Sequence, residues 1–258
     1  MQIRLRQSLP LPPMSLRNLI GNPALREFDN PRGTLIYPYL APQDYESILD
    51  FGCGCGRVAR QLIQQTARPR AYLGFDLHQG MIDWCKVNLA PHAAEFRFEH
   101  HDIYNIGLNP NGGARTLPLP VGDGTISLFN AISVFTHSMQ DQVEYYLHEA
   151  VRALKPEGAL HATWFLFDKT VFPMMQDFQN ALFINETDPS NAVIFDREWL
   201  KRTAGDAGLV ITWARPPKIR GFHWHIVMRP AGDATAEVEL PPDNAPTGHH
   251  PPPLSAQG

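Results

Sequence analysis

The chain has 258 residues, 43% of them hydrophobic and 19% charged, and a formal net charge of −4 at pH 7. This length and composition suit one globular α/β domain with some appended segments. The acidic balance argues against a nucleic-acid partner held by its phosphates, because such proteins usually carry a basic surface. No stretch reaches the roughly 18 apolar residues of a membrane span, and the N-terminus has no apolar signal segment. We therefore expect a cytoplasmic protein without nucleic-acid or membrane partners.

The two ends of the chain differ from its middle. Residues 1–40 are rich in proline, with apolar residues between the prolines, which predicts an irregular N-terminal arm or cap. Residues 231–258 are rich in Pro, Ala and Gly and hold few large apolar residues, so we expect a disordered tail. An α/β domain is expected between them, over residues 41–230.

Strand and helix patterns alternate along that middle region. Short apolar runs predict strands at 47–51, 71–76, 96–102, 125–135 and 159–167. Helical spacing of apolar residues predicts helices over 58–64, 81–89 and 143–154, and a further helix over 196–208 with Asp196 as its N-cap. Two last strands, at 209–214 and 222–228, have no helix between them. The pattern predicts a Rossmann-like, seven-stranded, mostly parallel sheet with helices on both faces and a C-terminal antiparallel hairpin.

The turn after the first strand reads LDFGCGCGR, with Gly52, Gly54 and Gly56 at alternate positions. Such glycines let the chain turn sharply and let a ligand lie against bare backbone. Asp76 ends the second strand, where its carboxylate can accept hydrogen bonds from both ribose hydroxyls of a nucleotide cofactor. Asp102 ends the third strand in the same manner.

The cysteines of this turn raise the question of a metal. Cys53, Cys55 and Cys85 are the three cysteines of the chain, and an odd number gives no disulfide framework. A zinc site needs about four ligands, and the third cysteine lies on a predicted helix face. We expect no metal, with Cys53 lining a cofactor pocket through its backbone and the thiols filling space.

These motifs, taken in order, resemble those of the class I S-adenosylmethionine-dependent methyltransferases. The resemblance covers roughly residues 45–230 and includes the closing hairpin. It implies that LDFGCGCGR cradles the methionine part of the cofactor, with the acid Asp50 holding its amino group. It also implies that Met81 packs on the adenine and that Asp102 and Ile103 lie at the adenine. SLFNAISVFTH is similar to the fourth-strand motif, and LKPEG to the family's LKPGG turn before strand five.

The resemblance implies S-adenosylmethionine as the cofactor and a small molecule as the methyl acceptor. Asn130-Ala131-Ile132-Ser133 departs from the Asp/Asn-Pro-Pro-aromatic tetrapeptide of the DNA and protein-amide enzymes, which counts against those acceptors. The expected cofactor contacts are Asp50, Gly52, Cys53, Gly54, Gly56, Arg57, Asp76, Leu77, Met81, Asp102, Ile103 and Asn130.

Three residues or segments are candidates for the acceptor side. His137 ends the predicted fourth strand, where a neutral imidazole can take the proton of an attacking hydroxyl or amine; a substrate contact or a helix-start role is the alternative. The insert at 170–195 stands where the family places a lid, and its Phe172 and Met175 suit an apolar or aromatic acceptor. Trp164 is expected either to form a pocket wall or to pack in the core.

Other classes of function stay open. Gly54-x-Gly56-x-x-Ala59 satisfies the dinucleotide pattern, which is compatible with an NAD(P)-dependent oxidoreductase. A nucleic-acid methyltransferase predicts salt-dependent binding to RNA or DNA. A non-catalytic scaffold would keep the fold without a working pocket.

Overall fold

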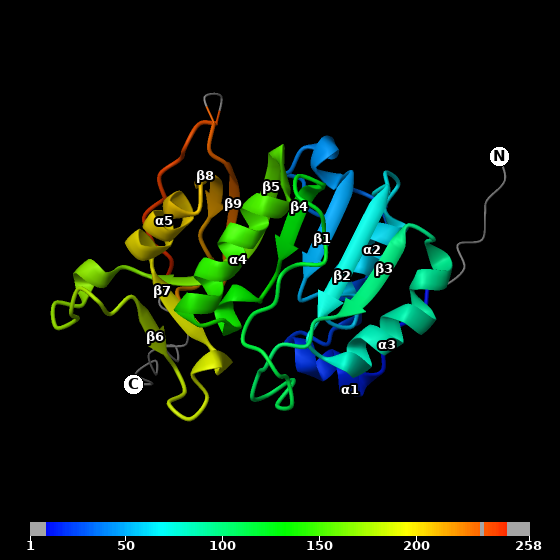
Figure 1. The fold of residues 1–258 in the computed structure, drawn as a ribbon, viewed down its shortest axis with the longest axis horizontal. Helices are drawn as coiled ribbons and strands as arrows, with labels where there is room; N and C mark the ends of the chain where they lie inside the picture. Colours follow the sequence, from blue (N-terminus) through cyan, green and yellow to red (C-terminus); the bar gives the residue numbers. More distant parts are fainter. Residues whose placement is uncertain (1–8, 233–234, 247–258) are drawn as a thin grey trace, which may run out of the picture. The chain divides into compact units, whose positions relative to one another are not determined.

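The computed structural model describes residues 9–232 and 235–246 (Figure 1). The chain divides into two compact units, Met1–Ile132 with Ala153–Ala159, and Ser133–Arg152 with Leu160–Gly258. The strand β5 (Leu154–Phe167) therefore belongs in part to each unit.

The first unit is built on four parallel strands. They are β1 (Ser47–Phe51), β2 (Ala71–Asp76), β3 (Phe96–His100) and β4 (Ile126–Ala131), hydrogen-bonded in the order β3-β2-β1-β4. The register places Asp50 of β1 opposite Gly74 of β2 and Asn130 of β4. Every residue of β4 is buried, as expected of a parallel strand covered on both faces. This register brings polar side chains together at the carboxyl ends of the strands.

Helices connect these strands. The glycine turn leads into α2 (Arg57–Gln64), which buries Ala59, Leu62 and Ile63. The turn after β2 leads into α3 (Gln79–Asn88), which contacts β2 and β3. A short 3-10 turn, Ala90–His92, follows α3. Each helix presents its apolar stripe inward, and both begin just after a strand.

The N-terminal arm is ordered over its described residues. It contains α1 (Met14–Arg17) and the 3-10 turns Asn18–Ile20 and Leu25–Phe28, and a further 3-10 turn, Pro42–Tyr45, follows it before β1. Arg60 of α2 is 5% exposed and anchors the arm, donating hydrogen bonds to the carbonyls of Leu9, Pro10 and Phe28 and pairing with Asp29. A guanidinium has five N–H donors, so this one buried side chain provides hydrogen bonds to several backbone carbonyls of the arm.

The second unit combines a helix layer with a mixed sheet. It contains the 3-10 turn Phe135–His137, most of α4 (Gln140–Ala153), the turns Lys169–Val171 and Pro189–Asn191, and α5 (Arg197–Asp206). Its strands are the later part of β5, β6 (Ala181–Phe183), β7 (Val193–Asp196), β8 (Leu209–Arg215) and β9 (Trp224–Pro230). β9 runs antiparallel to β5 and to β8, β7 runs parallel to the end of β5, and β6 is antiparallel to β7.

The expected Rossmann-like, mostly parallel sheet with its closing antiparallel hairpin is confirmed. The Asp196 N-cap is also present, because its carboxylate accepts a hydrogen bond from the Trp199 amide at 3.0 Å. The predicted fourth strand, 125–135, is too long: it ends at Ala131, and Ser133 turns the chain with φ of 57°. The fifth strand begins at Leu154, so LKPEG is extended and not a turn.

The insert at 170–195 contains strands that were not predicted. It supplies β6 and β7, so nine strands are present in the described residues where seven were predicted. Residues 172–180 contain no helix or strand, and their path consists of turns and irregular backbone.

Part of the predicted disordered tail has a defined path. Arg197 donates to the carbonyls of Leu240 and Pro241, and Lys201 pairs with Glu239 at 2.7 Å. The rest of that tail, 233–234 and 247–258, lies outside the described residues, as do residues 1–8 of the arm. Within 9–232 and 235–246, no helix has the length and apolar character needed to cross a bilayer.

Candidate cofactor site in the first unit

The turn between β1 and α2 adopts a backbone that only glycine takes easily. Gly52, Gly54 and Gly56 have φ of 74°, 55° and 77°, a region in which a side chain is strained. Space is limited as well, since a Cβ on Gly54 would lie 2.9 Å from Ile20 Cγ2, and one on Gly56 would lie 2.4 Å from Leu89 Cδ1. The predicted glycine turn is therefore present, with the conformation expected of a turn that presents bare backbone.

Asp76 ties the second strand to this turn. Its Oδ2 accepts a hydrogen bond from the Gly54 amide at 2.8 Å, and its Oδ1 accepts one from the His78 amide at 2.8 Å. Burial raises the pKa of Asp76, while these two backbone donors act in the opposite direction. A carboxylate oxygen accepts more than one hydrogen bond, so the side chain fixes the turn and retains acceptor capacity for ribose hydroxyls.

Asp50 lies at the centre of a buried polar network. It is 2% exposed. Its Oδ2 accepts a hydrogen bond from the Tyr72 hydroxyl at 2.5 Å, and its Oδ1 accepts one from Asn130 Nδ2 at 2.7 Å. Burial raises the pKa of Asp50 to about 6, against the lowering effect of the Tyr72 and Asn130 hydrogen bonds. The predicted contacts Asp50 and Asn130 are thus brought together, and Tyr72 joins them without having been predicted.

The three cysteines are buried around the same turn. Cys85 Sγ lies 3.7 Å from the Gly54 carbonyl, and Cys53 Sγ would lie 3.0 Å from a Cβ on Gly74. Burial raises the pKa of all three thiols, that of Cys55 to about 11, which keeps them protonated near neutral pH. Among the described residues, no three His, Cys, Asp or Glu side chains form a group suited to a metal ion.

The N-terminal arm covers one side of the turn. Phe28, Cys55 and Met81 form a buried apolar cluster, and Leu16 and Ile20 pack against it. Met81, the residue expected to pack on an adenine, is only 1% exposed, because the arm encloses it. This contact was not predicted, because the arm residues that make it show no periodic pattern.

The remaining predicted contacts, Arg57, Leu77, Asp102 and Ile103, lie in the segments that follow β1, β2 and β3. Leu77 accepts a hydrogen bond at its carbonyl from His100 Nε2 at 2.9 Å, and Arg57 is half-buried at the start of α2. Asp102 is exposed beyond the end of β3 and accepts a hydrogen bond from Asn109 at 2.9 Å, while Ile103 beside it is buried. All twelve predicted cofactor contacts therefore belong to the first unit.

The four predicted acceptor-side residues belong to the second unit. His137 lies in a 3-10 turn, not at the end of a strand, with its side chain exposed and its Nδ1 3.0 Å from the Ser190 carbonyl. Trp164 is fully buried and stacks on Phe135 with ring centroids 4.6 Å apart, so it packs in the core. Phe172 is exposed and Met175 is half-buried.

A further polar pair in the second unit was not predicted. Ser133 has φ of 57° and is the one non-glycine residue with positive φ in the described part of the chain. Its amide donates to Thr163 Oγ1 at 2.7 Å, and its Oγ lies 3.0 Å from His223 Nε2. Residues in this strained conformation are concentrated at functional sites. The conformation could not be predicted from the sequence, because a single serine within an apolar run does not indicate a positive φ.

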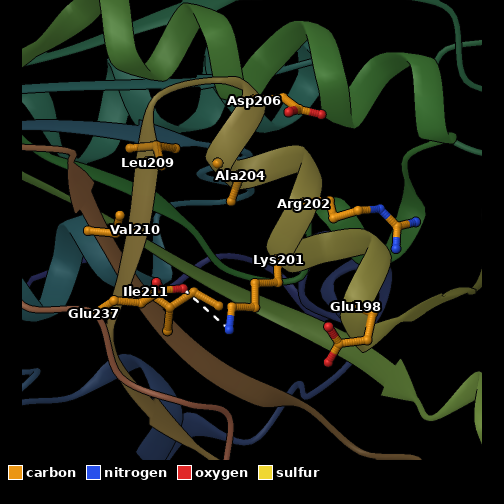
Figure 2. A pocket seen from close by; sticks show the side chains of 10 residues that line it. Glu198, Lys201, Arg202, Ala204, Asp206, Leu209, Val210, Ile211 and Glu237 are labelled. Carbon is orange, nitrogen blue, oxygen red and sulfur yellow. Dashed lines mark ion pairs between the residues drawn. The ribbon is translucent and has the colours of Figure 1, made fainter.

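The second unit also has a depression of about 410 Å³ at the surface of α5 and β8. Figure 2 shows Lys201 in it, directed toward Glu237 at 3.6 Å. Lys201 also pairs with Glu239. Among the residues that line the depression, Lys201 and Glu237 form an ion pair, and none of the predicted site residues lines it.

Comparison with known proteins agrees with this geometry. Residues 48–158 match the family model of a methyltransferase domain. A solved S-adenosylmethionine-dependent methyltransferase from Aquifex aeolicus is 13% identical, covers 85% of this chain and 99% of its own, and superposes with a TM-score of 0.53. At this identity the likeness shows the fold.

Two other solved structures are similar over a smaller part. The [4+2]-cyclase SpnF is 19% identical, covering 66% of this chain and 52% of its own, with a TM-score of 0.46. An O-methyltransferase of neocarzinostatin biosynthesis, solved with S-adenosylhomocysteine and 1,4-dihydroxy-2-naphthoic acid, is 13% identical, covering 74% and 51%, with a TM-score of 0.49. This chain thus spans about half the length of each of these two proteins.

Proposed function

We propose that this chain, in which residues 48–158 match the family model of a methyltransferase domain, is a class I S-adenosylmethionine-dependent methyltransferase that transfers the cofactor's methyl group to an oxygen or nitrogen nucleophile of a small-molecule acceptor. The observation that carries the proposal is the glycine turn, where three positive-φ glycines lie beside the buried Asp50 and the half-buried Asp76. In this proposal residues 41–230 form the catalytic domain, residues 1–40 cap it and 170–195 act as a lid.

The residues of the first unit fit the cofactor. The backbone amides and carbonyls of the glycine-rich turn suit the amino-acid part of the ligand. Asp50 suits its ammonium group and Asp76 its ribose. Leu77, Met81, Asp102 and Ile103 are assigned to the adenine side. The bound cofactor supplies a methyl group activated by the sulfonium charge, so the protein's task is to hold acceptor and methyl in line.

The transfer is a displacement at carbon. A lone pair of the acceptor oxygen or nitrogen forms the new bond to the methyl carbon, the carbon–sulfur bond breaks, and its electron pair stays on sulfur. The acceptor's proton leaves to a base. A backbone carbonyl only accepts hydrogen bonds, so in neutral His137 the proton lies on Nδ1, directed at Ser190, and the Nε2 lone pair is open. We assign the base role to this Nε2 atom.

The acceptor we propose is apolar or aromatic. Phe172 and Met175 of the insert support this assignment, because they are not buried in the core of the second unit. A nucleic-acid acceptor fits less well with a formal charge of −4.

The first test is calorimetric titration with S-adenosylhomocysteine, beside NAD and NADP. The proposal requires binding of S-adenosylhomocysteine and none of the nicotinamides. Preferential binding of NAD or NADP would support the hypothesis of an NAD(P)-dependent oxidoreductase instead. Once the cofactor is established, the acceptor class is tested with a panel of phenols, hydroxynaphthoic acids and aromatic amines. Methyl transfer to each compound is measured by the release of S-adenosylhomocysteine. The variant His137→Gln should slow this transfer without weakening S-adenosylhomocysteine binding.

A further inference from the structure

The tyrosine in the Asp50 network has no place in the function described so far. Tyr72 is 2% exposed on β2, and its ring stacks on Phe96 with centroids 4.5 Å apart. Its hydroxyl donates to Asp50 Oδ2 at 2.5 Å, a short distance of the kind that charge-assisted hydrogen bonds show. Packing fixes the ring, and the ring in turn fixes one oxygen of the carboxylate.

Asp50 requires such support to remain charged. A buried carboxylate without partners becomes protonated, because burial disfavours the charged form. The groups that interact with it come from several elements: Tyr72 and Asp76 of β2, Asn130 of β4, Arg57 of α2, Tyr37 of the arm, Cys53 of the glycine turn and Cys85 of α3. Asp76 opposes ionisation and Arg57 favours it. Tyr72 and Asn130 are the hydrogen-bond donors, and each occupies one of the roughly two acceptor positions of its oxygen.

We propose that Tyr72 is a positioning residue for the cofactor, whose phenol O–H holds Asp50 as an ionised, fixed acceptor for the ammonium group of S-adenosylmethionine. This inference rests on the proposed function. Tyr72 does not touch the ligand in this arrangement; it acts through Asp50. The alternative is that Tyr72 is simply a core side chain whose hydroxyl is satisfied by the nearest acceptor.

Two ligands separate these alternatives. S-adenosylhomocysteine carries the ammonium group, whereas 5′-methylthioadenosine has the same nucleoside and sulfur without the amino-acid part. Tyr72→Phe should weaken S-adenosylhomocysteine binding about tenfold or more, the usual effect of losing a hydrogen bond to a charged group, and leave 5′-methylthioadenosine binding within about twofold. Tyr146→Phe, at another buried tyrosine and in the second unit, is the control and should change neither.

A double-mutant cycle tests whether Tyr72 works through Asp50. In an Asp50→Asn background, Tyr72→Phe should cause no further loss of S-adenosylhomocysteine affinity. Affinity should also fall as the pH drops through the pKa of Asp50, and Tyr72→Phe should move that fall to higher pH because it removes a bond that stabilises the carboxylate. If Tyr72→Phe does not fold, 3-fluorotyrosine at position 72 provides a second test, because it keeps the ring and makes the phenol O–H a stronger hydrogen-bond donor. It should move the fall in S-adenosylhomocysteine affinity to lower pH.

The outcomes are separable. If the wild-type protein does not bind S-adenosylhomocysteine, the proposed function fails and this inference with it. If the wild type binds but Tyr72→Phe leaves the affinity and its pH dependence unchanged, only the role of Tyr72 is overturned. Equal weakening of both ligands would show a structural role and overturn it too. Additive losses in the cycle would contradict action through Asp50.

Discussion

Gly56→Ala tests the claim that the glycine turn is both strained and crowded. Gly56 has φ of 77°, and an added Cβ would lie 2.4 Å from Leu89 Cδ1 and 3.0 Å from Cys85 Sγ. Leu89 and Cys85 are both fully buried, so neither moves aside freely. The substitution therefore combines a backbone penalty with overpacking.

The magnitude follows from these two parts. The left-handed conformation costs an alanine about 1–2 kcal/mol, and overpacking a filled core costs typically about 1–3 kcal/mol. Gly124→Ala separates them, because Gly124 has φ of 63° with nothing within 4 Å of an added Cβ. Gly124→Ala should lower the free energy of unfolding by about 1–2 kcal/mol, and Gly56→Ala by about 2–5 kcal/mol.

Urea unfolding at equilibrium, followed by tryptophan fluorescence and by circular dichroism, gives both values. The comparison requires that the two probes agree, so that a two-state treatment applies. Equal losses for Gly56→Ala and Gly124→Ala would refute the crowding argument, since strain alone would then account for both.

Three other predictions concern single side chains. Asp76→Ala should greatly weaken S-adenosylmethionine binding in calorimetry, because Asp76 is assigned to the ribose and also fixes the Gly54 amide. The control Asp83→Ala, at an exposed α3 position, should leave the affinity unchanged. Equal affinities of the two variants would show the ribose assignment to be wrong. Asp196→Ala should cost about 0.5–2 kcal/mol of unfolding free energy through loss of the α5 cap, and an unchanged urea midpoint would contradict the cap. Burial, and to a smaller extent the neighbouring His225, lowers the pKa of His161 to about 3. The unfolded chain therefore binds a proton at this histidine near pH 6.5, whereas the folded protein does not. Stability should therefore fall as the pH drops below about 6.5, and His161→Gln should flatten that fall in thermal scans; an unchanged slope would remove His161 as a cause.

The features predicted correctly are those in which local chemistry allows few alternatives. Positive φ at three alternate positions requires glycine, so the turn of Gly52–Gly56 is visible in the sequence. Asp196 was identifiable because a carboxylate before a helical pattern has one common use, the N-cap. The alternation of apolar strands and helices was sufficient for the fold class.

The features that were missed depend on tertiary contacts. Tyr72 has the appearance of an ordinary strand residue, and only the register of β1 against β2 places its hydroxyl at Asp50. The end of β4 was misplaced because the apolar run continues past Ala131, while the turn at Ser133 is held by Thr163 from a distant strand. The strands of the insert were missed because they form by pairing with β5 and with each other, which short segments do not reveal by periodicity.

The division of the chain has a practical consequence for work with fragments. The chain passes from one unit to the other at 132/133, 152/153 and 159/160, so neither unit is a single contiguous stretch. The segment 48–158 that matches the methyltransferase family model would carry Ser133–Arg152 without the other residues of its unit, and would lack the arm held by Arg60. A contiguous truncation therefore exposes side chains that are buried in the whole protein, and such surfaces favour aggregation. Binding and stability are properties to measure on the full chain.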